Sequence, residues 1–155
     1  MASPAFDERL SAPLGFWIAG LVFVGFGIFE MAAGFTYVVY VPVALFLVGF
    51  FIVPLALAGR VRIRVQDGKL IAGKDELAVT TVTSITPLDR EATRLRLGPQ
   101  ADPAALNVIR GWIGPSVMVR LSNPDPVPYW VVSSRRPDEL AAAIKSERAA
   151  AKAAR

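Results

Sequence analysis

Two long apolar runs in the first half of the chain limit what it can fold into. They extend over residues 16–34 and 37–58, and no Lys or Arg occurs between Arg9 and Arg60. Each run has about 20 residues, which is the length that a helix rising ~1.5 Å per residue needs to cross a ~30 Å hydrocarbon layer. The sequence therefore predicts a hairpin of two transmembrane helices.

The charges around the two runs predict their orientation. Of the 17 Lys and Arg residues, Arg9 precedes the runs and 16 follow them. Because Lys and Arg near the ends of spans stay on the cytoplasmic side, both termini are expected in the cytoplasm. A cleaved signal peptide ending near residues 31–34 is the alternative. The first run is longer than the ~7–15-residue core of such a peptide, and a second run follows at once.

Three glycines recur every seven residues in the first run: Gly20, Gly27 and Gly34. This spacing places them on one side of a helix, where another helix can approach closely. The groove predicts a helix-packing face, filled either by the second span or by a partner protein.

The rest of the chain has the pattern of a small α+β domain. Strands are expected at residues 61–65, 69–72 and 76–85, with a hairpin turn at Asp67-Gly68. Asp89 is expected to cap a helix that ends at Gly98. Further elements follow from the same patterns: a short helix over 104–109, strands over 117–122 and 129–133, and a final helix from Pro137.

Strands followed by one terminal helix predict an antiparallel sheet or partial barrel capped by that helix. After Ala149 only Ala, Lys and Arg remain, so the end of the chain is expected to protrude. The expected organisation is an N-terminal cytoplasmic segment (1–14), the membrane hairpin (15–58), the cytoplasmic domain (59–147) and a basic Ala-rich tail (148–155).

The missing residue types exclude several kinds of chemistry. The chain has no His and no Cys, so the usual triads, thiolate nucleophiles and soft-metal sites cannot form. A Ser–Lys dyad or the carboxylates of Asp89 and Glu91 remain formally possible. A hydrolase or transferase would need a pocket near Asp89, Ser116 or Asp125. We expect no catalytic residue, cofactor or metal. The scattered basic residues do not predict nucleic-acid binding.

Two groups of arginines are candidates for binding. Arg135 and Arg136 follow Tyr129-Trp130, whose side chains alternate between strand faces, so at least one aromatic is expected outside the core, beside the arginines. Such a pair suits a protein interface or a phosphate. In the structural alternative, Trp130 packs in the core and the arginines pair with acids of the same segment: Asp125, Asp138 or Glu139.

The second group directly follows the hairpin and consists of Arg60, Arg62 and Arg64. Juxtamembrane arginines contribute on the order of 1 kcal/mol each toward anionic lipid. They predict an anchor at the inner leaflet that sets topology, and selective lipid recognition is the alternative.

Three segments give the chain a resemblance to an actinobacterial membrane family, domain of unknown function 3093. They are residues 7–10, residues 89–98 with 101–103, and residues 125–140. The resemblance implies a bacterial plasma-membrane (inner-membrane) protein with two spans and a cytoplasmic domain, and it implies no activity. The strand-then-helix region also looks like pleckstrin-homology-type domains attached to membrane hairpins.

We therefore expect first a non-enzymatic accessory or interaction subunit of a larger membrane assembly, with membrane lipids and a membrane protein as partners. The alternative is a membrane-tethered binder of anionic lipid headgroups or of a small phosphorylated ligand. A homo-oligomer is left open.

Overall fold

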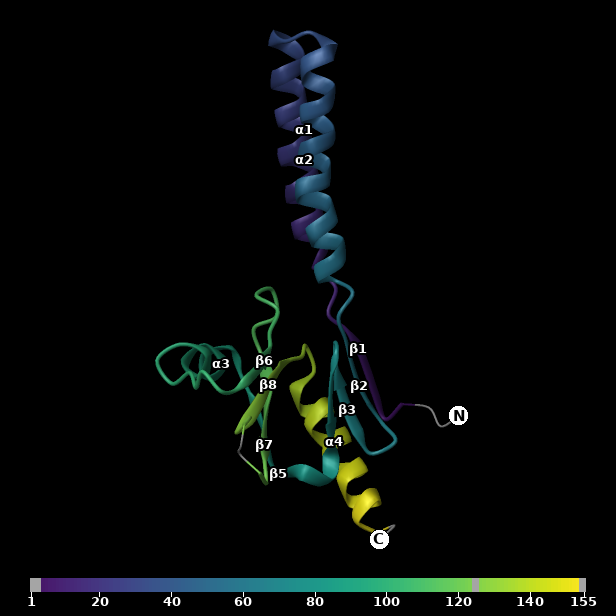
Figure 1. The fold of residues 1–155 in the computed structure, drawn as a ribbon, viewed down its shortest axis with the longest axis vertical. Coiled ribbons are helices and arrows are strands. Elements are labelled where there is room, and N and C mark those ends of the chain that lie inside the picture. Colours follow the sequence, from purple (N-terminus) through teal and green to yellow (C-terminus); the bar gives the residue numbers. More distant parts are fainter. Residues whose placement is uncertain (1–3, 124–125, 154–155) are drawn as a thin grey trace. The chain divides into compact units, whose positions relative to one another are not determined.

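The computed structural model describes residues 4–123 and 126–153, which divide into two compact units (Figure 1). One unit is the stretch Ser11–Arg60, and the other joins the residues before it to those after it. The elements are β1 (Phe6–Arg9), α1 (Leu14–Gly34), α2 (Tyr37–Ala58), β2 (Arg62–Gln66), β3 (Lys69–Ala72), β4 (Asp75–Ala78), the 3₁₀ turn η1 (Val79–Thr81), β5 (Val82–Leu88), α3 (Arg90–Leu97), β6 (Leu106–Val108), β7 (Ser116–Leu121), β8 (Tyr129–Ser133) and α4 (Pro137–Ala153).

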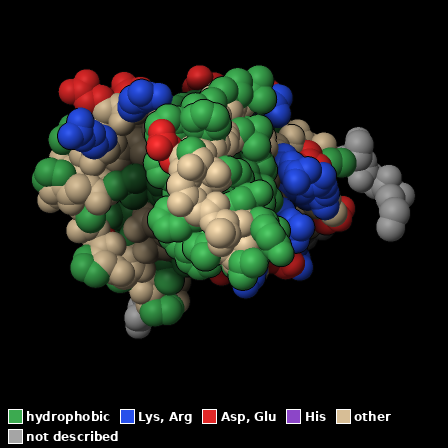
Figure 2. Space-filling view, turned by 90° about the horizontal axis from the view of Figure 1, so that it is seen from above, with side chains coloured by type: hydrophobic (Ala, Val, Ile, Leu, Met, Phe, Trp, Pro, Cys, Tyr) green, Lys and Arg blue, Asp and Glu red, His purple; other side chains and the backbone are tan. Residues whose placement is uncertain are grey.

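The unit Ser11–Arg60 is a helical hairpin with an apolar surface. Both of its helices, α1 and α2, are long and apolar enough to cross a membrane, as the sequence predicts. Most of their large apolar side chains are exposed, and Figure 2 shows such side chains over the face that it views. The helices pack through Phe23 and Phe51, whose ring centroids lie 5.0 Å apart. An apolar surface of this extent is typical of helices that lie in lipid or against another protein.

The first sheet contains a strand that the sequence analysis missed. Its order is β1-β2-β3-β4, all antiparallel, and Phe6 of β1 pairs with Val65 of β2. Phe6, Glu8 and Leu10 are buried while Asp7 is exposed, which is the period-2 pattern of a half-covered strand. Residues grouped above as an N-terminal segment thus form an edge strand of the folded domain.

The predicted turn at Asp67-Gly68 is confirmed. Both residues have positive φ, 50° and 69°, as a tight hairpin between right-twisted strands requires. The backbone N–H of Gly68 donates to Glu147 Oε2 of α4 at 2.9 Å. The last helix therefore fixes this turn from outside the sheet.

The second sheet has the order β5-β7-β8-β6. The strand predicted over 76–85 is interrupted by η1, so β4 and β5 belong to different sheets. The helix predicted over 104–109 is wrong. Asp102 forms only one turn, with its side chain accepting from Ala104 N, and Leu106–Val108 then pairs parallel to β8. Burial of Leu106 and Val108 at the sheet edge outweighs the local helix-start signal.

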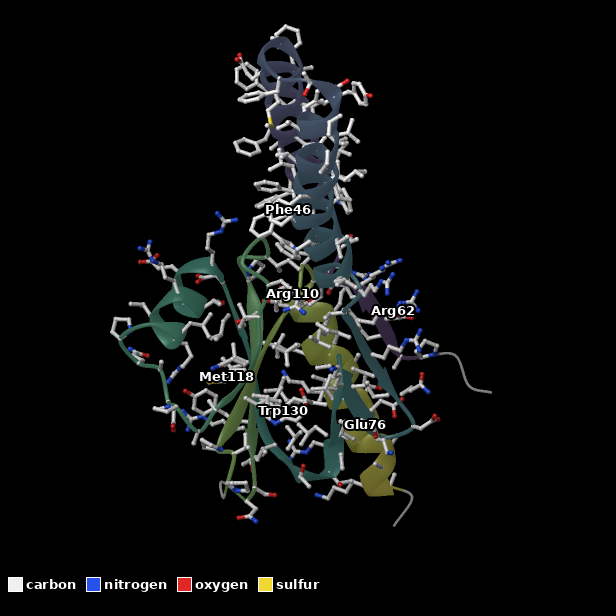
Figure 3. The ribbon with its side chains drawn as sticks, turned by 45° about the horizontal axis from the view of Figure 1, so that its top comes forward. Phe46, Arg62, Glu76, Arg110, Met118 and Trp130 are labelled. Atoms are coloured by element: carbon white, nitrogen blue, oxygen red, sulfur yellow. The ribbon has the colours of Figure 1, made fainter. Side chains whose placement is uncertain are left out.

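Side chains cover both faces of the second sheet. On one face the main core joins both sheets to α4, and its largest fully buried members include Ile63, Leu70, Val119, Leu140 and Ile144. On the other face Leu88, Met118, Tyr129 and Val131 pack near α3, where Asp89 caps the helix as predicted. Figure 3 shows Trp130 and Met118 on opposite sides of the β7–β8 pair.

The last helix continues to the end of the described residues. It runs to Ala153, and Ala151 packs against the main core. Arg148 Nη1 also donates to the carbonyl of Thr83 at 3.2 Å. From Ala149 the described residues are helical and mostly exposed, and only Ala151 contacts the core, so the segment is not isolated at that position.

Candidate functional site: the clasp on the N-terminal strand

The structure changes the interpretation of Tyr129-Trp130. Both side chains are buried, with 8% and 6% of their surfaces exposed. Trp130 belongs to the main core. Tyr129 lies on the other face of the sheet, among the buried side chains near α3, where its hydroxyl accepts from Asp102 N at 3.2 Å. Because the second sheet is covered on both faces, the alternation of side chains along β8 exposes neither aromatic. The expectation of an exposed aromatic beside the arginines is wrong.

A buried carboxylate, that of Glu8, contacts the residues that follow β8. Glu8 of β1 is 6% exposed, and its Oε2 accepts from Ser134 Oγ at 2.5 Å. Its Oε1 accepts from the backbone N–H of Arg135 at 2.9 Å, and Arg136 N donates to Ser134 Oγ at 3.0 Å. Backbone N–H groups at the start of a helix lack intrahelical partners. Glu8 therefore accepts from the segment that leads into α4, from a strand 126 residues away in sequence, and Ser134 Oγ accepts from the N–H of Arg136 next to the helix.

The side chains of Arg135 and Arg136 reach back to the same strand. Arg135 Nη1 donates to the carbonyl of Arg9 at 3.2 Å, and Arg136 Nη2 donates to the carbonyl of Asp7 at 3.4 Å. Asp7 and Arg9 are alternate residues of an edge strand, and their carbonyls lie on the side of β1 that has no neighbouring strand in the sheet. The arginines cover part of an edge that could otherwise pair with another chain.

Two further contacts hold Arg136 in place. Its Nη1 lies 2.9 Å from Glu139 Oε2, and its guanidinium carbon lies 5.1 Å from the centroid of the Phe6 ring. The pairing with Glu139 confirms that part of the structural alternative, whereas Asp125 lies outside the described residues. We call the set Glu8, Ser134, Arg135 and Arg136 the clasp.

The clasp acts on the strand that leads into the helical hairpin. β1 precedes the hairpin and β2 follows it, yet they pair in register, and Leu10 N donates to the carbonyl of Val61 at 2.9 Å. Within the hairpin unit, a Cβ added to Gly59 would lie 3.4 Å from Ser11 Cα. The first and last residues of the hairpin unit are therefore close to each other. Both ends of the hairpin are thus joined to one folded domain through a few residues.

Basic side chains gather on the exposed face of the β1–β2 pair. Arg62 lies directly opposite Arg9, and Arg64 pairs with Asp7 at 3.2 Å. Arg62 and Arg64 share a face, as predicted, and Figure 3 shows Arg62 pointing away from the sheet. The opposed Arg9 and Arg62 give this face of the strand pair a local positive charge. Arg60, in the hairpin unit, is also exposed.

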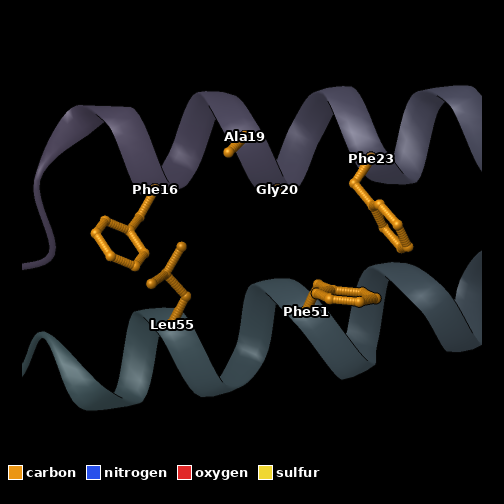
Figure 4. Close-up of a pocket in the computed structure, with 6 residues that line it drawn as sticks. All are labelled: Phe16, Ala19, Gly20, Phe23, Phe51 and Leu55. Atoms are coloured by element: carbon orange, nitrogen blue, oxygen red, sulfur yellow. The ribbon is translucent and has the colours of Figure 1, made fainter. Parts of the chain in front are cut away.

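The three glycines of α1 have different surroundings. A Cβ on Gly27 would lie 3.5 Å from Leu47 Cδ1 of α2, so the second helix fills the groove there. Nothing lies within 4 Å of a Cβ on Gly20 or Gly34. Gly20 borders an open cavity of about 360 Å³ between the two helices (Figure 4).

The remaining polar side chains of interest serve structural contacts. Asp89 accepts from Ala92 N at 2.7 Å as the cap of α3, and Thr93 Oγ1 lies 2.8 Å from Ser116 Oγ in a buried pair. An open hollow bordered by Asp89 and Asp138 contains two carboxylates. Over the described part of the chain, no three Asp, Glu, His or Cys residues come together as metal ligands would.

The fold and the clasp define a class of protein: an α+β domain of two sheets and a terminal helix, into which a long apolar helical hairpin is inserted after the first strand. More specifically, the chain belongs to the family described as protein of unknown function (DUF3093), whose model matches residues 5–144. This match includes β1 and all four clasp residues. No curated protein and no solved structure matches the chain.

Glu8 and Ser134 were missed by the sequence analysis. The alternation of Phe6, Glu8 and Leu10 was visible in the sequence, but a charged residue at an inward position argues against a strand until its partners are known.

Replacing Glu8 by Ala should destabilise the folded domain by about 2–4 kcal/mol, because it removes the acceptor of the buried Ser134 hydroxyl and of the partly buried Arg135 N–H. The measurement is denaturant or thermal unfolding of the full chain in detergent. The matched control is Asp7→Ala on the same strand, where an exposed ion pair is worth only about 0.2–1 kcal/mol. Equal losses in the two variants would contradict the structural role of the clasp.

Proposed function

We propose that the protein is a two-span plasma-membrane protein with cytoplasmic termini, and that it is a non-enzymatic accessory or interaction subunit of a larger membrane assembly. The observation that supports this proposal is the joining of both hairpin ends to one domain. Between Leu10 and α1, and between α2 and Val61, the chain has three and two residues, respectively. At no more than ~3.6 Å per residue, neither linker reaches beyond about 15 Å.

Short linkers on both sides suit a subunit whose domain must stay at the membrane surface. A catalytic or ligand-binding module that searches the cytoplasm is served better by a long flexible linker. The domain would instead present a fixed surface to a neighbour in the same membrane. Its two sheets and terminal helix also suit a pleckstrin-homology-type origin, with β1 and the parallel β6–β8 pair as departures.

A second function, binding of anionic lipid headgroups or of a small phosphorylated ligand, is favoured by the Arg9–Arg62 pair. Chain length alone keeps these arginines close to the ends of α1 and α2. Guanidinium groups at this position can each donate to a phosphate oxygen of a headgroup. Arg135 and Arg136 are less suited to a ligand, because both already bind β1.

The accessory role predicts a stable partner. The tagged full-length protein, expressed at its natural level and extracted in a mild detergent, should migrate on a native gel above the size of a monomer or homodimer. Mass spectrometry of that band should find one or more membrane proteins in stoichiometric amounts. A lone monomer or homodimer would contradict the accessory role and leave the ligand-binding function as the better one.

The lipid alternative predicts stabilisation by anionic bilayers. Full-length protein in nanodiscs with phosphatidylglycerol should unfold at a higher temperature than in pure phosphatidylcholine, because a ligand of the native state stabilises it. R9Q/R62Q should lose most of this difference. The control is R120Q/K145Q, which removes the same charge from exposed positions outside β1 and β2. An equal loss in the control would indicate a general charge effect and contradict a site at β1–β2.

A further inference from the structure

A cavity between the two hairpin helices is open on one side and lined by apolar groups. Its volume is about 360 Å³, and it lies near the ends of the hairpin that continue into the sheet, where α1 begins and α2 ends. Figure 4 shows side chains from both helices around the space that Gly20 leaves. The lining residues are Phe16, Ala19, Gly20, Phe23, Phe51 and Leu55.

The shape of the cavity excludes a whole helix as its occupant. A transmembrane partner needs a continuous groove of small residues. Here Leu47 closes the groove at Gly27, and the ring pair Phe23–Phe51 crosses between the helices before that point. The open part extends from Phe16 to Phe23, about 10 Å along the helix. A space of this size between helices fits a narrow apolar chain better than a helix about 10 Å wide.

The positive charge at this end of the hairpin indicates what kind of molecule would place an apolar chain in the cavity. Arg60 is exposed and belongs to the same unit as the cavity, five residues after the lining residue Leu55. The only acidic side chain of the hairpin unit, Glu30, lies near the opposite end of α1. An occupant with an apolar tail and a negatively charged head would therefore place its tail against the apolar lining and its head near Arg60.

We propose that the cavity holds one acyl chain of an anionic phospholipid, whose phosphate contacts Arg60. This proposal rests on the membrane insertion proposed above and adds a bound lipid to it. The lipid would fill the space at Gly20 and become a fixed part of the hairpin, whereas the surrounding bilayer lipids would exchange freely.

The test is native mass spectrometry of the full-length protein in detergent, titrated with phosphatidylglycerol or with phosphatidylcholine of the same acyl chains. Wild type should retain one phosphatidylglycerol at least fivefold better than phosphatidylcholine. Gly20→Leu should reduce phosphatidylglycerol binding at least fivefold, because the leucine fills the cavity. It should fold normally, since nothing lies within 4 Å of a Cβ there. Arg60→Gln should abolish the preference between the two lipids.

The matched control is Gly25→Leu, on the same helix and also with nothing within 4 Å, but outside the cavity lining. It should bind phosphatidylglycerol like wild type. Unchanged binding by Gly20→Leu, an equal loss in Gly25→Leu, or no preference for phosphatidylglycerol in wild type would overturn the proposal. A dimer that Gly20→Leu disrupts would assign the cavity to a second copy and overturn it as well. Alkaline carbonate extraction of wild type tests membrane insertion separately, so failure of the lipid site and failure of insertion are distinguishable.

Discussion

The pairing of β1 with β2 is the interaction on which the other features depend. These strands lie on either side of the helical hairpin in sequence, so the first sheet is complete only when the chain has returned from α2. Closing a loop of this length would carry an entropic cost for a flexible chain. Packing of α1 against α2 lowers that cost, because it holds residues 11 and 59 close together. The hairpin and the domain thus support each other's folding.

The clasp explains why a carboxylate and two arginines occur at these positions. Glu8 points inward, where an unpaired carboxylate would be strongly destabilising, and its two oxygens accept from the Ser134 hydroxyl and the Arg135 N–H. The side chains of Arg135 and Arg136 donate hydrogen bonds to the outward carbonyls of the same strand. An edge strand with open carbonyls is a template for aggregation, so this cover also protects the domain. Arginines that suggested a ligand site from sequence therefore have a structural task.

The sequence predicts elements whose signal is local, and it fails where distant segments decide the outcome. The apolar runs, the Asp67-Gly68 turn and the cap at Asp89 follow from a few adjacent residues each, and all three are confirmed. The strand around Glu8 depends on partners at Ser134 and Arg135, and β6 depends on a neighbour in β8. No pattern inside those segments reports such partners, because the stabilisation comes from burial and pairing across the fold.

The same reasoning limits prediction of the candidate site. Arg135 and Arg136 were found from sequence, but their partners on β1 were not, so a protein interface or phosphate site and a structural pairing with nearby acids both stayed open. The glycine spacing predicts one packing face, whereas contact with Leu47 divides it into a filled part at Gly27 and an open part at Gly20. Side-chain size on the facing helix decides this division, and sequence alone does not show which residues face each other.

The most direct test of the account is a cross-link between β1 and β2 in native membranes. The chain has no Cys, so D7C/R64C introduces two thiols at directly opposed positions of the exposed face. Mild oxidation should join them rapidly and protect both from a maleimide polymer that retards the protein on a gel. D7C/E76C, which places the second thiol on β4, should stay reactive. Equal reactivity of the two variants after oxidation would contradict a domain built on both sides of the hairpin.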